Sequence, residues 1–565
     1  MMNICRMLTV FLATVLISPI SLLAQGTSKK ESNPKNWHLQ DKAETGSYGI
    51  SLDKAYQFVK GRNGKTIVVA VMDTGIDTTH EDLKNVLWNN PKEIPGNKID
   101  DDKNGYVDDI HGWNFLGGKD GKNIEHDTDE GSRVYHRFKK KYESVTDESS
   151  LSPREKDEFT MFKKAKAKVE GGGPSIDVVF LRRIFNNAKK SDSLIRLALK
   201  KQIYIGSELE TFKPVTAEER RAKSSLMPFY KQEGMMDKAN TDFLEEFDLE
   251  LSGEERKEAA KTKEPRDYRN EAVKDNEMDI NDRFYGNNDL MGGALSHGTY
   301  CAGIIAAQRN NNKGMDGVAD NVKIMMLRML SDGDEHDKDI ALAIRYAVDH
   351  GAHIISMSFG KDFSPEKRWV DEAVMYAESK GVLMIHAAGN DHENIDSTDN
   401  FPNPEYLNGK GRSSTFITVG ASGNHDNGGP IGSFSNYGKN EVDIFAPGVS
   451  IYATTTGRNA YGSVSGTSMS APVVAGTAAF LMSYFPELSA KQIKYAIEKS
   501  AVPLTAKVKK PGTDELVSFS ELSKNPGLLN AYEAAKLAST LKPENKETKA
   551  LVMPKPKMVV KKKRA

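Results

Sequence analysis

Cysteine is almost absent from the 565 residues, and its two copies, Cys5 and Cys301, lie far apart. Cys5 falls in an N-terminal stretch that we expect to be removed, which leaves Cys301 without a partner for an intramolecular disulfide. Net charge is also nearly absent, at -1, so there is no reason to expect nucleic acid or an acidic membrane as the main partner. Stability must therefore come from a buried core, for which 38% hydrophobic residues suffice.

The chain also lacks an apolar run long enough for a comfortable membrane span. Its first residues instead have the order of a secretory signal peptide: Arg6, an apolar stretch from Met7 to Ile17, and small residues ending at Ala24. We predict cleavage after Ala24, and hence a protein that is secreted, periplasmic or associated with the cell envelope. An uncleaved membrane anchor is the alternative.

Short apolar runs rich in β-branched residues recur along the chain, beginning with TIVVAVM at Thr66–Met72. Such runs are typical of strands buried on both faces, as in a parallel sheet. Two helical patterns, at Asp339–His350 and Glu366–Lys380, lie between them and are followed by Gly351 and Gly381, where a left-handed C-cap is expected. The alternation predicts an α/β fold: a doubly wound, mostly parallel sheet with helices on both faces. The other predicted strands are Val322–Leu327, His353–Met357, Val382–Ala388 and Phe416–Gly420.

The segment 131–280 interrupts this alternation, because it is crowded with charges of both signs at helical spacing. We predict an insertion of exposed helices within a domain spanning 61–540, preceded by an N-terminal extension at 25–60. The tail 541–565 is rich in Lys and Pro and is expected to be flexible. The insertion is either a solvated decoration or an element that packs beside the active-site cleft and restricts which substrates enter.

Three short segments at the ends of predicted elements carry reactive side chains. Asp73 follows the TIVVAVM strand, His297 precedes the apolar helical stretch CAGIIAA, and Ser468 precedes VVAGTAAFLM. Each alone is an ordinary turn or capping residue. Together they supply an orienting carboxylate, a base and a nucleophile at element ends, where α/β sheets build their sites.

These segments resemble those of the subtilisin-like serine peptidases, or subtilases, whose triad has the chain order Asp, His, Ser. The motif GTSMSAP around Ser468 matches the family pattern in full, and DTG at Asp73 is close. The motif HGTYCAG at His297 departs from it, because Tyr300 stands where many members have a second His. The resemblance implies an endopeptidase that acts on polypeptides.

In that chemistry His297 would activate the weak nucleophile Ser468, and Asp73 would hold the imidazole in the useful tautomer. The reaction would pass through an acyl-enzyme and need no cofactor. The resemblance also implies that Asn390, after the VLMIH strand, donates to the oxyanion together with the Ser468 N–H. It further implies that Ser358, Phe359 and Gly360 pair with the backbone of the substrate. Together with Ala387, Ala388 and Gly389 they would form the walls of the primary specificity pocket.

Residues 100–109 read DDDKNGYVDD, the start of a calcium loop. Its oxygen donors would be the side chains of Asp100, Asp102 and Asn104 and the backbone of Tyr106 and Asp108. His111 stands where a helix–loop–helix calcium site needs Glu, so we expect a structural calcium loop inside the domain rather than that motif. An acidic turn without metal is the alternative.

Two other functions compete with an active endopeptidase. A catalytically inactive binding protein on the same fold is disfavoured by the presence of every triad and oxyanion residue. A non-peptidase serine hydrolase with a G-x-S-x-G motif is disfavoured because Ser470 replaces the final Gly. The chain also departs from many subtilases in its N-terminal extension, since about 40 residues between the predicted cleavage site and the first strand leave no room for a full inhibitory propeptide.

Overall fold

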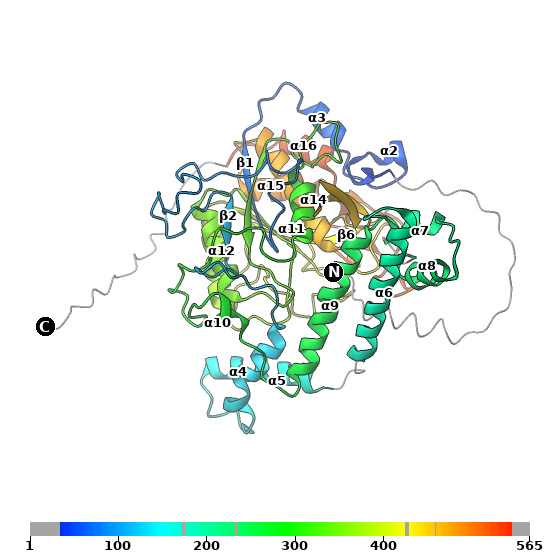
Figure 1. Ribbon diagram of the computed structural model, residues 1–565. Helices are drawn as coiled ribbons and strands as arrows, with labels where there is room; N and C mark the ends of the chain where they lie inside the picture. The colour runs from blue at the N-terminus through cyan, green and yellow to red at the C-terminus, as the bar shows by residue number, and fades with distance from the viewer. Residues whose placement is uncertain (1–33, 172–176, 232–234, 424–428, 458, 545–565) are drawn as a thin grey trace.

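The computed structural model describes residues 34–171, 177–231, 235–423, 429–457 and 459–544 (Figure 1). The predicted signal peptide and most of the predicted C-terminal tail lie outside these residues. Within them, no helix combines the length and the apolar character needed to cross a bilayer.

A nine-stranded sheet forms the centre of the protein, with strand order β10-β13-β7-β6-β5-β4-β1-β3-β2. Its neighbouring strands are parallel except for the pair β10 and β13. The predicted mostly parallel sheet is therefore confirmed. The strands are β1 (Ile67–Asp73), β2 (Gly112–Asn114), β3 (Val322–Arg328), β4 (Ile354–Met357), β5 (Leu383–Ala387), β6 (Phe416–Ser422), β7 (Ile444–Pro447), β10 (Val502–Pro503) and β13 (Gly527–Leu528). Two smaller antiparallel pairs are β8 (Ile451–Thr455) with β9 (Ala460–Val464), and β11 (Val508–Lys509) with β12 (Leu516–Val517).

Strand β1 shows why its sequence is continuously apolar. Val69 and Val71 point into one core, and Ala70 and Met72 point into another on the opposite face. Because both faces are covered, neither set of alternating side chains can be polar. Burial of one such valine or methionine contributes about 1.5–3 kcal/mol relative to leaving it exposed.

Helices cover both faces of the sheet, as predicted. One core includes side chains from α3 (Leu52–Phe58), α11 (Ser296–Ala306), α14 (Thr467–Tyr484), α15 (Ala490–Lys499) and α16 (Ala531–Ala538). The other includes α12 (Asp337–Asp349) and α13 (Lys367–Ser379). The expected glycine C-caps are present, since Gly351 and Gly381 have φ of +81° and +73°. The remaining short helices are η1 (Trp37–Leu39), α2 (Lys42–Thr45), η2 (Leu407–Gly409) and η3 (Phe519–Glu521).

The strand order places Asp73 at a crevice. Strand β1 lies between β3 and β4, so the chain continues on one side of β1 and later returns to its other side. In open α/β sheets such a switch leaves a crevice at the carboxyl ends of the strands. Asp73 is the last residue of β1 and is therefore at that crevice.

Between β2 and α11 the chain forms the helices α4 to α10. Their bounds are α4 (Glu130–Tyr142), α5 (Pro153–Glu170), α6 (Val178–Leu199), α7 (Gly206–Thr211), α8 (Ala217–Tyr230), α9 (Asn240–Ala260) and α10 (Tyr268–Ala272). They have apolar cores of their own, one around Phe162 in α5 and one around Phe247 in α9. Figure 1 shows α6 and α9 side by side, with α4 and α5 at one end of the molecule. The helices are thus amphipathic and packed, not simply exposed.

Candidate active site

Asp73 and His297, 224 residues apart in the chain, are in direct contact. His297 is the second residue of α11, and its Nδ1 lies 2.7 Å from Oδ1 of the fully buried Asp73. The same Oδ1 accepts a hydrogen bond from the Thr74 N–H at 2.7 Å. Gly298 permits this contact, because a Cβ there would lie 2.0 Å from the Gly75 carbonyl oxygen. The loop after β1 and the first turn of α11 therefore approach closely only with glycine at this position.

Ser468 lies at the start of α14, where it is 7% exposed. Its Oγ donates to the Ser358 carbonyl oxygen at 3.1 Å, and Ser358 Oγ donates to the Ser468 carbonyl oxygen at 2.9 Å. In this structure the Ser468 hydroxyl therefore bonds to backbone rather than to His297. Rotation about its Cα–Cβ bond would be needed to present its proton to the imidazole.

A cavity of about 370 Å³ brings the predicted residues together, since His297, Ser468 and Asn390 all line it. Asp73 lies behind His297 and does not line it. The predicted substrate-binding residues that line it are Ser358, Phe359, Gly360, Ala387 and Gly389. Ala388 does not, because its side chain packs into a separate apolar cluster with Ile395 and Phe445.

The side chain of Asn390 is oriented by a residue that sequence reasoning did not single out. Its Oδ1 accepts hydrogen bonds from the Thr467 N–H at 2.8 Å and from Thr467 Oγ1 at 3.1 Å. Thr467 Oγ1 in turn accepts from the Gly389 N–H at 3.1 Å. Because Oδ1 is occupied, Nδ2 is the end of the amide left for a ligand. Thr467 belongs to the recognised GTS motif, and its role could have been sought there.

Two glycines shape the walls of the cavity. Gly389 has φ of +102°, and a Cβ there would lie 2.3 Å from Asn436 Nδ2. A Cβ at Gly360 would lie 2.6 Å from Asn400 Oδ1. Both asparagines donate to the Ala388 carbonyl oxygen, at 3.0 and 3.1 Å. A side chain at either glycine would therefore displace the hydrogen bonds that fix this loop.

Cys301 is buried one helical turn after His297. Its Sγ lies 3.5 Å from the Ser468 carbonyl oxygen. Burial raises the pKa of the thiol well above its usual range, and the Asp73 carboxylate adds to the shift. The thiol therefore stays protonated at neutral pH, and Cys301 acts as a small buried hydrophobic residue.

Tyr300, the departure from the family motif, connects α11 to the insertion. Its hydroxyl donates a short hydrogen bond to Asp242 at the start of α9, and both side chains are buried. Burial raises the pKa of the Asp242 carboxyl. The partner of Tyr300 thus comes from a part of the chain that a minimal domain would lack.

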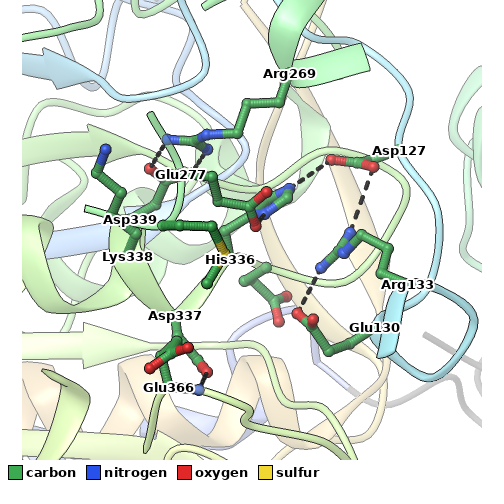
Figure 2. A network of polar contacts seen from close by, with 12 residues as sticks. Asp127, Glu130, Arg133, Arg269, Glu277, His336, Asp337, Lys338, Asp339 and Glu366 are labelled. Atoms are coloured by element: carbon green, nitrogen blue, oxygen red, sulfur yellow. Dashed lines mark hydrogen bonds and ion pairs between the residues drawn. The ribbon is translucent and has the colours of Figure 1, made fainter. Parts of the chain in front are cut away.

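Ion pairs join the insertion to the loop that follows β3 and to the first turn of α12 (Figure 2). His336 contacts Glu277 at 2.6 Å through Nδ1 and Asp127 at 2.8 Å through Nε2. Burial and Arg133 lower the pKa of His336, but Glu277 and Asp127 outweigh them and raise it to about 9.

Arginines of the insertion make the other pairs of this contact. Arg269 of α10 pairs with Asp339 at 2.7 Å, and Arg256 of α9 pairs with Asp332 at 2.8 Å. The side chains of both aspartates are fully buried. Through Asp332 the insertion is held against the loop that lines the cavity, and through Asp339 it is held against α12.

The acidic loop before β2 gathers three carboxylates. Oxygens of Glu93, Asp100 and Asp102 lie within 4.8 Å of one another. Such hard oxygen donors suit calcium rather than a soft metal. Burial raises the pKa of Glu93, and the charges of Asp109 and Asp102 add to the shift. Glu93 precedes the recognised motif, and nothing in the sequence indicated that its carboxylate would lie beside those of Asp100 and Asp102.

Asp108, whose backbone is one of the predicted calcium donors, makes several hydrogen bonds to neighbouring loops. Its carboxylate accepts from the N–H groups of Gly96 and Lys98 at 2.9 and 2.8 Å, and its carbonyl oxygen accepts from Asn288 Nδ2 at 3.0 Å. The Asp108 N–H also donates to Glu93 Oε2 at 3.2 Å, so Asp108 connects neighbouring loops and lies beside the carboxylate cluster. Of the other predicted donors, Asn104 lies nearby, and its Oδ1 accepts from the Tyr106 N–H at 2.7 Å.

Known proteins similar to this chain are proteases. The model of the Subtilase family matches residues 64–532. The "Thermophilic serine proteinase" of Bacillus sp. (strain AK1) is 42% identical over 207 residues, which are 36% of this chain and 47% of that protein. Thermitase of Thermoactinomyces vulgaris is 38% identical over 220 residues, which are 39% of this chain and 71% of that protein. The chain thus spans about half the length of the first relative. A solved protease structure from Pseudoalteromonas arctica has a TM-score of 0.44 at 19% identity, covering 90% of this chain and 100% of that chain.

Proposed function

Since the chain belongs to the subtilase family of serine-type endopeptidases, we propose that it hydrolyses internal peptide bonds through Ser468, His297 and Asp73. The observation that carries the proposal is the 2.7 Å contact between Asp73 and His297 beside the cavity that Ser468 also lines. The cavity is lined by two short segments, residues 358–360 and Ala387 with Gly389, which could pair with the backbone of a bound polypeptide.

The Asp73–His297 contact sets the protonation of the imidazole. Nδ1–H donates to the Asp73 carboxylate, so Nε2 carries the lone pair and acts as the base. Ser468 Oγ attacks the substrate carbonyl carbon while its proton passes to Nε2. The imidazolium, stabilised by Asp73, then gives that proton to the leaving amine as the peptide C–N bond breaks. Water attacks the resulting ester by the reverse proton route, which frees Ser468.

The negative charge on the carbonyl oxygen needs donors that are already in position. Asn390 Nδ2 and the Ser468 N–H supply them. Thr467 supports this role because it occupies Asn390 Oδ1 and leaves the amide nitrogen for the substrate. The start of α14 adds the positive end of the helix dipole at the same place.

Calcium binding and export complete the proposal. Glu93, Asp100 and Asp102 would hold one calcium ion as a structural support. Chelation of calcium should lower the midpoint of thermal unfolding of the wild type, and it should leave the midpoint of Glu93→Gln unchanged. An unchanged midpoint of the wild type on chelation would count against the site.

Export is proposed from the signal-like residues 1–24. N-terminal sequencing of the mature protein would test the cleavage after Ala24.

Casein hydrolysis by the wild type and by Ser468→Ala tests the central proposal. We expect hydrolysis by the wild type, its loss in the variant, and its loss when a serine-directed covalent inhibitor labels the wild type. Circular dichroism and thermal unfolding show that both proteins are folded. A folded wild type that binds peptides but hydrolyses none would favour the inactive binding protein instead.

A further inference from the structure

One side of the active-site cavity is formed by α9 of the insertion. Glu246, Glu250 and Glu254 all line the cavity, and their spacing of four residues places them on one face of the helix. Arg256 holds α9 against the loop after β3 through Asp332, at 2.8 Å. The acidic face of α9 is therefore fixed beside the catalytic residues and does not swing freely.

Other residues that line the cavity are acidic too. Asp129 precedes α4, and Asp334 and Glu335 lie in the loop after β3. Of the described residues that line the cavity, thirteen are Asp or Glu and three are Lys or Arg. Because the whole chain has a net charge of only -1, negative charge is concentrated here. A cleft with one sign of charge attracts ligands of the opposite sign.

Several of these carboxylates already have cationic partners. Asp127 contacts Arg133 and His336, and Asp332 contacts Arg256 and His126. These pairs belong to the contact between the insertion and the rest of the domain. Their charges are taken up in that contact. Glu254 has a cationic partner too, but this is Lys257 on the same helix, and the pair is partly exposed, at 24% and 45% of the two side chains. Such a pair contributes little and can give way to a substrate cation.

Glu335 differs from them. It is 8% exposed and lines the cavity, yet its Oε2 is buried and has no hydrogen-bond partner among the residues that the structure describes. The nearby Lys361 bonds to the backbone oxygen of Glu335 and directs its charge to Glu130 and Asp337. Burial and Asp334 raise the pKa of Glu335 to about 8. A buried carboxyl oxygen that accepts no hydrogen bond is costly, and a donor that reaches it removes this cost.

We propose that this part of the cleft is a subsite for one Lys or Arg side chain of the polypeptide substrate, formed by Glu335, Asp334 and Glu254. A guanidinium or ammonium group supplies the donors that Glu335 lacks and the positive charge that the surrounding carboxylates favour. Since Glu254 comes from α9, the insertion becomes part of the specificity of the enzyme. The inference rests on the proposed endopeptidase function.

Internally quenched peptides test the subsite. One neutral peptide is the reference, and in its relatives a single Lys, Arg, Gln or Glu is placed at each of four positions before the scissile bond. At one position we expect kcat/KM for Lys and Arg to exceed that for Gln by at least about 10-fold, with Glu below Gln. The preference should shrink as salt rises from 0.05 to about 0.5 M, because exposed charges are then screened.

Point variants assign the preference to residues. Glu335→Gln and Glu254→Gln should each reduce the Lys-to-Gln ratio by about 10-fold or more. Lys257→Gln should increase it, because Lys257 neutralises Glu254 at 2.9 Å. Glu258→Gln is the matched control, since Glu258 lies on α9 outside the cavity and pairs with Lys261. Glu258→Gln should keep both the wild-type rate on the neutral peptide and the wild-type Lys-to-Gln ratio.

The outcomes separate this subsite from the general activity. A wild type that cleaves the neutral peptide but treats Lys, Gln and Glu alike at every position overturns the subsite and leaves the endopeptidase intact. A preference that persists in both Glu335→Gln and Glu254→Gln also overturns it. If no peptide is cleaved, the proposed function fails and the subsite fails with it. If Glu335→Gln does not fold, Glu254→Gln and the salt dependence of the Lys preference still test the subsite.

Discussion

Replacing Arg269 by Met should show how strongly the insertion is attached. Arg269 is 3% exposed and makes two bidentate contacts: its Nη atoms bond to Asp339 at 2.7 and 2.9 Å, and Nε and Nη2 bond to Asp275 at 2.8 and 2.9 Å. Both carboxylates are themselves buried. Met fills a similar volume without charge, so the change removes the ion pairs more than the packing.

The magnitude follows from what the substitution leaves behind. Asp339 keeps only the Tyr285 hydroxyl as a donor among its present side-chain partners, whereas Asp275 keeps Lys338. Breaking a buried pair by removing one partner costs about 3–5 kcal/mol. We expect a loss in this range, which is a large part of the 5–15 kcal/mol that typically separates folded from unfolded states.

Urea unfolding followed by tryptophan fluorescence measures the loss. It should be done in a Ser468→Ala background, so that unfolded chains are not digested. Arg266→Met is the matched control: Arg266 lies near Arg269 in the chain and pairs with Glu271, but its side chain is 63% exposed. We expect no measurable shift of its midpoint. Equal shifts for the two variants, or less than about 1 kcal/mol for Arg269→Met, would refute the reasoning from burial.

Three further predictions concern other named contacts. The pKa of His336 is raised from 6.5 to about 9, so the stability that His336 contributes is fully present below pH 6.5 and is lost as the pH rises through 9. The difference in unfolding free energy between the wild type and His336→Gln should therefore shrink between pH 6.5 and 9. Asn390→Ala should lower kcat by roughly 100- to 1,000-fold, the range found for a related enzyme, with little change in KM for a neutral peptide. Tyr300→Phe should cost about 1–3 kcal/mol in urea unfolding because the buried Asp242 loses its donor.

The sheet was predictable because of its burial. Strands covered on both faces must be apolar throughout, so β1, β3, β4, β5 and β6 stand out as runs that differ from the observed strands by one or two residues at their ends. The hairpin of β8 and β9 was missed, since AYGSV in β9 combines small and polar residues. No hydrophobic period distinguishes such a strand from a loop.

The candidate site was predictable to the extent that local motifs carry it. Asp73, His297 and Ser468 each lie in a short recognisable segment, and the order of strands then brings the segments to one crevice. Glu93 and Glu335 have no such segment. Their positions depend on how loops fold back onto the domain, which is a property of tertiary packing rather than of local sequence.

The same contacts decide what happens when the insertion is removed. Deletion of 131–280 takes away Arg256, Arg269 and Glu277, the partners of Asp332, Asp339 and His336. Two of these pairs have fully buried carboxylates, and at about 3–5 kcal/mol each their loss is about 6–10 kcal/mol, which is comparable with the whole stability of a typical domain. The His336–Glu277 pair adds less, because the Glu277 side chain is 44% exposed. The deletion variant should therefore lack a cooperative unfolding transition in urea. A deletion variant that unfolds cooperatively and keeps its midpoint would show instead that the insertion is a separable decoration. If it fails to fold, as we expect, a change in its substrate preference has no meaning, and the role of the insertion at the cleft has to be measured with single substitutions on the acidic face of α9.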